Sequence, residues 1–156
     1  MSAPLLILAW GNRSRGDDAL GPLLLQAVQN SLSDSALAQI DFLEDYQLQI
    51  EHALDLVGRQ QVLFVDASVA CAAPFEVTDL RPAQDASLTT HTLSPQAVMG
   101  VFQQLQGTEP PSCTLLAIRG VSFELGEPPS ALALAHLKEA TDWTVRHVRD
   151  AIERLH

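Results

Sequence analysis

Short, uninterrupted apolar runs alternate along this chain with longer stretches in which apolar residues recur every three or four positions. The runs are typical of strands buried on both faces of a sheet, and the longer stretches are typical of helices that pack on one side. The pattern predicts buried strands at 5–10, 39–45, 61–68 and 113–120, and an alternating edge strand at 75–80. It predicts helices that begin near residue 18 and reach 32, and further helices at 47–57, 94–105 and from 130 towards 156.

The alternation of strands and helices predicts an α/β fold. We expect a three-layer αβα sandwich, in which a twisted, mostly parallel sheet of about five strands has helices on both faces. The 156 residues contain no internal repeat and no linker-like segment, so residues 1–156 are predicted to form one domain. In such sheets ligands bind beyond the carboxyl ends of the strands, where the strand order reverses. The loops after the strands are therefore the place to look for chemistry.

Composition excludes several classes of partner. The net charge is −10 and Lys138 is the single lysine, so the chain has no basic patch for nucleic acid or for an acidic membrane surface. Cys71 and Cys113 are too few for a disulfide scaffold. The first apolar run is much shorter than the roughly 20 residues that cross a bilayer. We therefore expect a cytoplasmic protein with no membrane segment.

Acidic residues follow two of the predicted strands. The segment GNRSRGDDALG, residues 11–21, places Asp17 and Asp18 beyond the first strand, and Asp66 comes at the end of the third. If these two strands are neighbours, as in a flavodoxin-like order, the carboxylates approach each other at one edge of the sheet. His91 lies in a third loop, shortly before the helix that Ser94 is predicted to cap.

Each of these residues also has an ordinary structural explanation. Asp66 can cap a turn, one aspartate of the pair can start a helix, and His91 can lie on the surface. Together, Asp18, Asp66 and His91 would supply two oxygens and one nitrogen, a set that suits a divalent first-row metal with open positions. The other histidines are expected to face solvent; they are His52, His136, His147 and His156.

A phosphoacceptor receiver domain is an alternative, because receivers also carry acidic residues after the first and third strands. Receivers use a lysine after a late strand, whereas Arg119 ends the late strand here and Lys138 lies inside the last predicted helix. The acidic pair also comes several residues beyond the first strand, behind a glycine loop. A non-catalytic metal-binding or receiver-like signalling domain remains the second hypothesis.

Four segments together resemble the [NiFe]-hydrogenase maturation endopeptidases. Residues 11–21 resemble the Gly-Asn-x-x-x-x-Asp-(Asp/Glu)-x-x-Gly signature of that family, which follows its first strand. VLFVDA, residues 62–67, resembles its second motif, and SLTTHTLSPQAV, residues 87–98, resembles its third, a histidine just before a helix. Residues 115–137 are similar to its late strand and the loop that leads into the last helix. The four segments occur in the family's order and span nearly the whole chain.

The resemblance implies an endopeptidase that removes the C-terminal extension of a [NiFe]-hydrogenase large-subunit precursor after nickel insertion. It implies that Asp18, Asp66 and His91 are the catalytic and metal-contacting residues. The nickel is expected to be presented by the substrate, and other divalent metals are expected to be able to occupy the site. The precursor is the implied partner, and we expect the enzyme to be a monomer.

The resemblance also suggests supporting roles. Asp17 matches the first acid of the signature and is expected to start the helix and to support the metal ligands. Gly11, Asn12 and Gly21 are expected to shape the loop. EDYQLQIEHALDL, residues 44–56, replaces a glycine-rich segment that many members of the family carry after strand two, and this change is expected to alter the choice of substrate.

Overall fold

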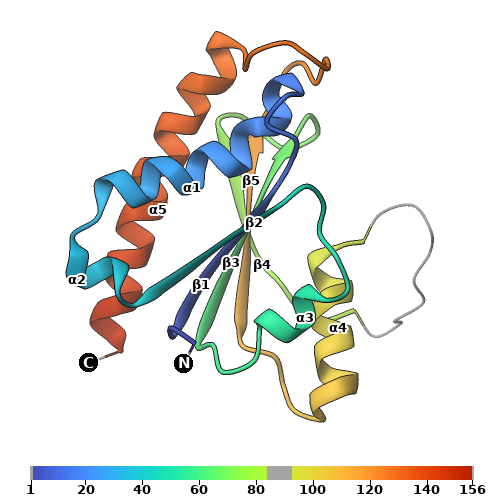
Figure 1. The fold of residues 1–156 in the computed structure, drawn as a ribbon, viewed down its shortest axis with the longest axis vertical. Coiled ribbons are helices and arrows are strands. Elements are labelled where there is room, and N and C mark those ends of the chain that lie inside the picture. The colour runs from blue at the N-terminus through green and yellow to red at the C-terminus, as the bar shows by residue number, and fades with distance from the viewer. Residues whose placement is uncertain (1, 84–92, 156) are drawn as a thin grey trace.

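The structure, a computed structural model, describes residues 2–83 and 93–155 (Figure 1). Within these residues one five-stranded sheet has the strand order β2-β1-β3-β5-β4. The first four strands in this order are parallel, and β4 is antiparallel to β5 at the edge. The strands are β1 (Leu5–Trp10), β2 (Ile40–Asp45), β3 (Gln61–Ser68), β4 (Phe75–Asp79) and β5 (Ser112–Arg119). The predicted α/β fold with a mostly parallel sheet is confirmed. The first and third strands are neighbours, which is the condition under which Asp18 and Asp66 were expected to approach each other.

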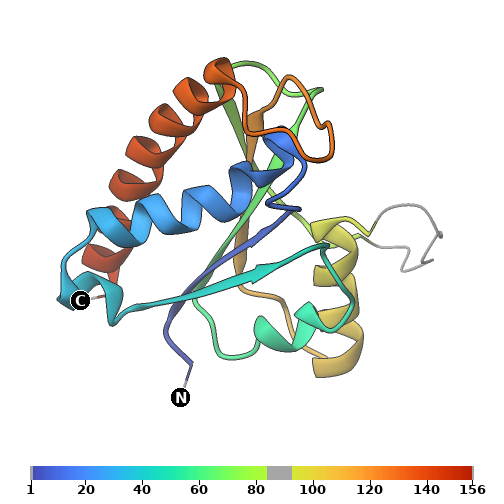
Figure 2. The ribbon, with the colours of Figure 1, turned by 45° about the horizontal axis from the view of Figure 1, so that its top comes forward.

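Helices cover both faces of the sheet. One face carries α1 and α5, and the other carries α3 and α4, as two views show (Figures 1 and 2). A 3₁₀ turn, η1, precedes α1. The bounds are η1 (Gly16–Ala19), α1 (Leu20–Ser31), α2 (Asp34–Leu37), α3 (His52–Asp55), α4 (Pro95–Gln106) and α5 (Ala131–Arg154).

Alternation along β1 divides the core into two layers. Leu5, Ile7 and Ala9 face α1 and α5, whereas Leu6 and Leu8 face α3 and α4. Because successive side chains of a strand point to opposite faces, a strand buried on both sides must be apolar throughout. This explains why the uninterrupted runs in the sequence located the strands.

Two helical segments differ from the prediction. The helix expected at 47–57 is a single turn, and three of its apolar residues, Ile50, Leu54 and Val57, are exposed. Leu48, Ala53 and Leu56 are buried, which is enough to anchor one turn but not a longer helix. The short helix α2 was not predicted. Its cap, the Ser33 hydroxyl, accepts a hydrogen bond from the backbone N–H of Ala36 at 3.3 Å.

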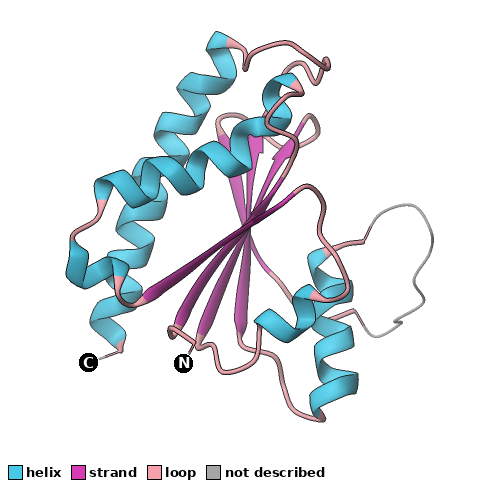
Figure 3. Cartoon of the chain, viewed as in Figure 1, coloured by secondary structure: helices cyan, strands magenta, loops and turns pink. Residues whose placement is uncertain are grey.

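Serine caps fix the starts of the longer C-terminal helices, and the predicted cap at Ser94 is confirmed. The Ser94 hydroxyl accepts from the Ala97 N–H at 3.1 Å, and the Ser130 hydroxyl accepts from the Ala133 N–H at 3.2 Å. No helix among the described residues is long and apolar enough to cross a membrane. The loops after β1, β3 and β5 gather at the carboxyl edge of the sheet (Figure 3).

Candidate functional site

The loop between β1 and η1 is shaped by two glycines. Gly11 has a φ of +149°, and a Cβ at this position would lie 2.0 Å from the backbone oxygen of Asp18, so no larger residue fits. A Cβ at Gly21 would lie 2.9 Å from the backbone oxygen of Trp10 and 3.3 Å from that of Val65. The first glycine therefore lets the loop close against Asp18, and the second lets α1 start directly against the ends of β1 and β3.

Asp18 is held in this loop by a backbone group. Its Oδ2 accepts a hydrogen bond from the Asn12 N–H at 2.7 Å, and the Asn12 side-chain oxygen accepts from the Ser14 N–H at 2.8 Å. Asp18 is half-buried at the carboxyl edge of the sheet. Its orientation is therefore set by the same Gly-Asn pair that opens the sequence motif.

Asp66 lies near the end of β3, in register with Ala117 of β5. Burial of the carboxyl, followed by the negative charge of Asp18, raises the pKa of Asp66 to about 7, and a hydrogen bond from the Ala67 N–H opposes this only in part. Because the charge of Asp18 contributes to the raised pKa of Asp66, the two carboxylates lie near each other at this edge of the sheet. Their joint role in metal contact and catalysis stays a prediction.

Asp17 lies in the first turn of η1, as expected of a residue at a helix start, but its side chain does not cap that helix. The residue before η1 is Arg15, and no side-chain cap is present there. Asp17 is fully buried and accepts hydrogen bonds from the N–H groups of Val121, Ser122 and Ser130 at 2.7, 3.0 and 2.6 Å, and from the Ser130 hydroxyl at 2.9 Å. Burial alone would raise the pKa of Asp17, but these four donors together lower it. Asp17 therefore anchors the loop between β5 and α5.

His91 lies outside the described residues, so its place as the third ligand stays a prediction. Among the residues that are described, no group of three or more His, Cys, Asp or Glu side chains is arranged to hold a metal ion. Of the three predicted site residues, the structure describes the two carboxylates, Asp18 and Asp66.

The prediction that the helical histidines face solvent is wrong for two of them, and His156 lies outside the described residues. His52 and His136 are both buried. The Nδ1 atom of His136 lies 2.9 Å from the backbone oxygen of Arg119, which ties α5 to the end of β5. His147 is half-buried and stacks on Trp143, with ring centroids 4.6 Å apart. The burial of His136 depends on its contact with the end of β5, which helical position alone does not reveal, whereas the stacking of His147 on Trp143 lies within α5.

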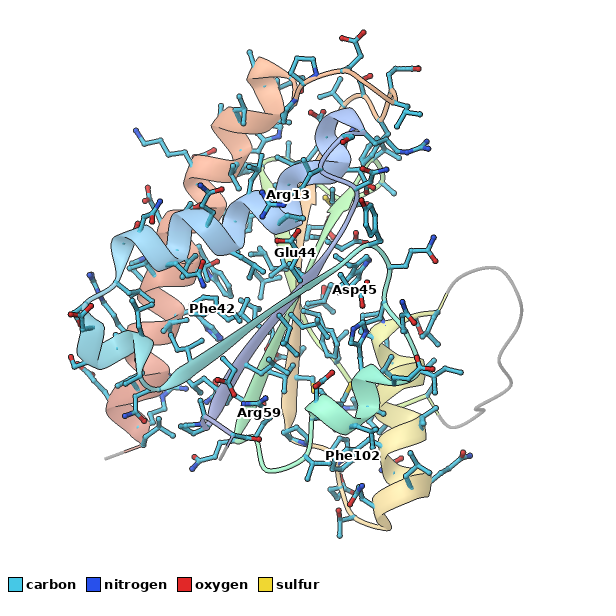
Figure 4. The ribbon with its side chains drawn as sticks, viewed as in Figure 1. Arg13, Phe42, Glu44, Asp45, Arg59 and Phe102 are labelled. Carbon is cyan, nitrogen blue, oxygen red and sulfur yellow. The ribbon has the colours of Figure 1, made fainter. Side chains whose placement is uncertain are left out.

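A hollow that the sequence analysis did not predict lies between the loop after β1 and the end of β2. A hollow of about 210 Å³ lies beside Gly11 and is lined by Gly11, Arg13, Glu44, Asp45 and Tyr46. Arg13 donates two hydrogen bonds to Glu44, at 2.8 and 2.6 Å (Figure 4). The sequence did hold one indication of this hollow, because Glu44 and Asp45 lie at the carboxyl end of β2, which pairs with β1.

Asp45 in this hollow is oriented by His52. The Gln49 N–H donates to His52 Nδ1 at 2.8 Å, so the neutral ring carries its proton on Nε2, which lies 3.2 Å from Asp45 Oδ2. These residues belong to the segment 44–56, whose effect on the choice of substrate stays a prediction.

No sequence-family model matches the chain, and no curated protein matches it significantly by sequence. Solved structures match it over nearly its whole length. The hydrogenase maturating endopeptidase HybD from E. coli has a TM-score of 0.70 at 23% identity, covering 97% of this chain and 94% of its own. The chain has the fold of the hydrogenase maturation proteases.

Two archaeal structures agree with this. The [NiFe] hydrogenase maturation protease HycI from Thermococcus kodakarensis KOD1 has a TM-score of 0.69 at 19% identity, covering 94% of this chain and 93% of its own. The hydrogenase 2 maturation peptidase from Thaumarchaeota archaeon SCGC_AB-539-E09 has a TM-score of 0.64 at 22% identity, covering 92% and 97%. The resemblance that the sequence motifs indicated therefore extends to the arrangement of strands and helices.

Proposed function

We propose that this chain is an endopeptidase that removes the C-terminal extension of a [NiFe]-hydrogenase large-subunit precursor after nickel has been inserted. The enzyme acts in the cytoplasm as a monomer, and the precursor is its partner. The observation that carries the proposal is the Asp18–Asp66 pair at the carboxyl edge of the sheet, in a fold that several hydrogenase maturation proteases share over more than 90% of their length.

The donor set supports recognition of a nickel ion that arrives with the substrate. Two carboxylates that repel each other are stabilised when a divalent cation enters between them, and carboxylate oxygens with an imidazole nitrogen are suitable ligands. Asp18 and Asp66 are the carboxylates, and His91 is the proposed nitrogen ligand. Other divalent metals are expected to be able to bind the same side chains.

The raised pKa of Asp66 suits proton transfer during peptide hydrolysis. A carboxyl that titrates at about 7 exchanges a proton near neutral pH, which is the property required of a general acid or base. The hydrogen bond from Asn12 meanwhile fixes Asp18 beside it. We propose that Asp66 releases its proton when the substrate-bound nickel enters, and that this ionised form engages the metal.

The strand order weighs against the receiver alternative. The flavodoxin-like order continues outward through strands four and five, whereas here β5 lies inside β4 and β4 runs antiparallel. Arg119, which stands in place of a receiver lysine, donates from its guanidinium to the backbone oxygen of Cys71. That contact gives Arg119 a structural partner at the end of the sheet.

Processing of the precursor tests the proposal directly. The chain is incubated with nickel-loaded and nickel-free precursor, and the mass of the precursor is followed over time. We expect loss of a C-terminal peptide from the loaded form alone, and no loss with Asp18→Asn or Asp66→Asn. Ser122→Ala, which leaves the backbone contacts at that position intact, is the matched control. Failure of the wild-type chain to shorten the loaded precursor would refute the proposed activity.

A further inference from the structure

The loop between β5 and α5 exposes apolar side chains although it is firmly held. Val121 is 54% exposed and Leu125 is 66% exposed, whereas Phe123 between them is partly buried against the core. The outward positions of a segment that covers a core are normally polar. Here Val121 and Leu125 are apolar and lie on the outer side, and none of the residues that the structure describes covers them.

This segment is bound to the loop that carries Asp18. Gly16 N–H donates to the Glu127 oxygen at 2.9 Å, Asp17 N–H donates to the Ser122 oxygen at 2.8 Å, and Arg15 and Leu125 form an antiparallel bridge. The four hydrogen bonds accepted by the Asp17 carboxylate hold the same segment from beneath. The backbone that carries the exposed side chains is therefore already held beside the loop of Asp18. Less conformational entropy is then lost when a partner binds.

The neighbouring strand end adds a third apolar residue. Gly120 N–H donates to the Ser68 oxygen at 2.9 Å, which continues the pairing of β3 with β5 beyond its last register pair. Val69, which follows Ser68 and comes three residues after Asp66, is exposed. We call Val69, Val121 and Leu125 the apolar rim of the site.

We propose that the apolar rim is the surface on which the folded body of the hydrogenase precursor docks while its C-terminal segment reaches Asp18 and Asp66. This inference rests on the proposed function. Two exposed carboxylates, Glu124 and Glu127, flank Leu125, so the rim fits an apolar patch that is bordered by Lys or Arg side chains. An apolar centre with a charged border is the usual anatomy of a protein–protein interface.

Charge argues against a second copy of this chain as the occupant. A symmetric dimer through the rim would bring Glu124 and Glu127 of both copies together, between two chains that each carry a net charge of −10. A basic partner face would meet attraction at the same positions. The rim therefore favours a different protein over self-association.

Steady-state processing of nickel-loaded precursor by Leu125→Ser tests the docking surface. Leu105, which is 63% exposed at the end of α4, supplies the matched control Leu105→Ser, because that end of the helix leads into the opposite edge of the sheet (Figure 1). We expect Leu125→Ser to raise KM about tenfold with kcat unchanged, as for loss of one large apolar contact. We expect Leu105→Ser to leave both within about twofold.

Three outcomes would overturn the inference. A KM for Leu125→Ser equal to that of the wild type would show that the rim does not contact the precursor. A fall in kcat without a change in KM would show that Leu125 supports the site and does not dock the substrate. A dimer of the wild-type chain in sedimentation that Leu125→Ser converts to a monomer would assign the rim to a second copy. A failure of the proposed function looks different, because the wild-type chain would then leave the loaded precursor intact.

Discussion

The carboxylate of Asp17 and the hydroxyl of Ser130 are joined by a hydrogen bond of 2.9 Å across 113 positions of the chain. Ser130 is also the cap of α5, because its hydroxyl accepts from the Ala133 N–H. One buried carboxylate thus connects the loop of the first motif to the start of the last helix. The first aspartate of the adjacent pair is a structural anchor, and the second faces the site.

We expect Asp17→Asn to lower the free energy of unfolding by about 3 kcal/mol, which is more than the roughly 1 kcal/mol of an ordinary helix cap. The amide would turn an –NH₂ group towards backbone donors and leave at least one of them without a partner. Urea denaturation of both proteins measures the difference. Ser122→Ala is the control, since Ser122 contacts Asp17 through its backbone N–H and backbone oxygen, which the substitution keeps. A loss below 1 kcal/mol for Asp17→Asn would contradict the anchoring role.

The sequence located the strands and the acidic pair because these depend on local pattern. Strands buried on both faces, such as β1 and β3, require continuous apolar runs whatever lies around them. The role of Asp17 was not predictable in the same way, because its four donors come from residues 121–130. The shortening of the helix expected at 47–57 depends similarly on which of its apolar residues find space beside α4, a tertiary condition that periodicity does not contain.

The Asp66 carboxyl should make stability depend on pH. Its pKa is raised on folding from its ordinary 3.8 to about 7, so between these values the folded chain holds a proton that the unfolded chain has lost. The free energy of unfolding therefore falls by about 1.4 kcal/mol for each pH unit across this window and levels off above it. We expect Asp66→Asn to remove this component.

Denaturation of wild type and Asp66→Asn at several pH values between 4 and 8 checks this, with the difference between the two proteins as the quantity of interest. Groups that do not interact with Asp66 contribute equally to the pH dependence of both proteins, so their contributions cancel in that difference. We expect the free energy of unfolding of Asp66→Asn to rise relative to that of the wild type as pH rises. A difference that does not change with pH would mean that Asp66 keeps an ordinary pKa.

Gly11→Ala should displace Asp18 and abolish processing, because the new Cβ would lie 2.0 Å from the Asp18 backbone oxygen. Gly107→Ala is a matched control. Gly107 has a φ of +69° and would meet no atom within 4 Å, so its replacement costs about 1 kcal/mol of backbone strain without a clash. Processing rate and denaturation are measured for both variants. Full processing by folded Gly11→Ala would show that the close approach to Asp18 is dispensable.

Nickel should bind the isolated chain weakly near neutral pH and should expel a proton as it binds. The pKa of Asp66 is about 7, so below this value the ion competes with a proton for one of its two carboxylate ligands, and affinity falls by up to tenfold per pH unit from this residue alone. Calorimetry in two buffers of different ionisation enthalpy counts the released protons at each pH.

Asp66→Asn should weaken nickel binding further and reduce the number of protons released, whereas Glu153→Gln, which removes an exposed carboxylate near the C-terminal end of α5, should change neither. A precursor whose own thiolates hold the nickel would deliver the ion at high local concentration, so the weak site becomes occupied only when loaded precursor is bound. Nickel insertion would then be checked before an irreversible cut. A tight, stoichiometric site in the isolated chain that drives cleavage of nickel-free precursor would show instead that the metal belongs to the enzyme.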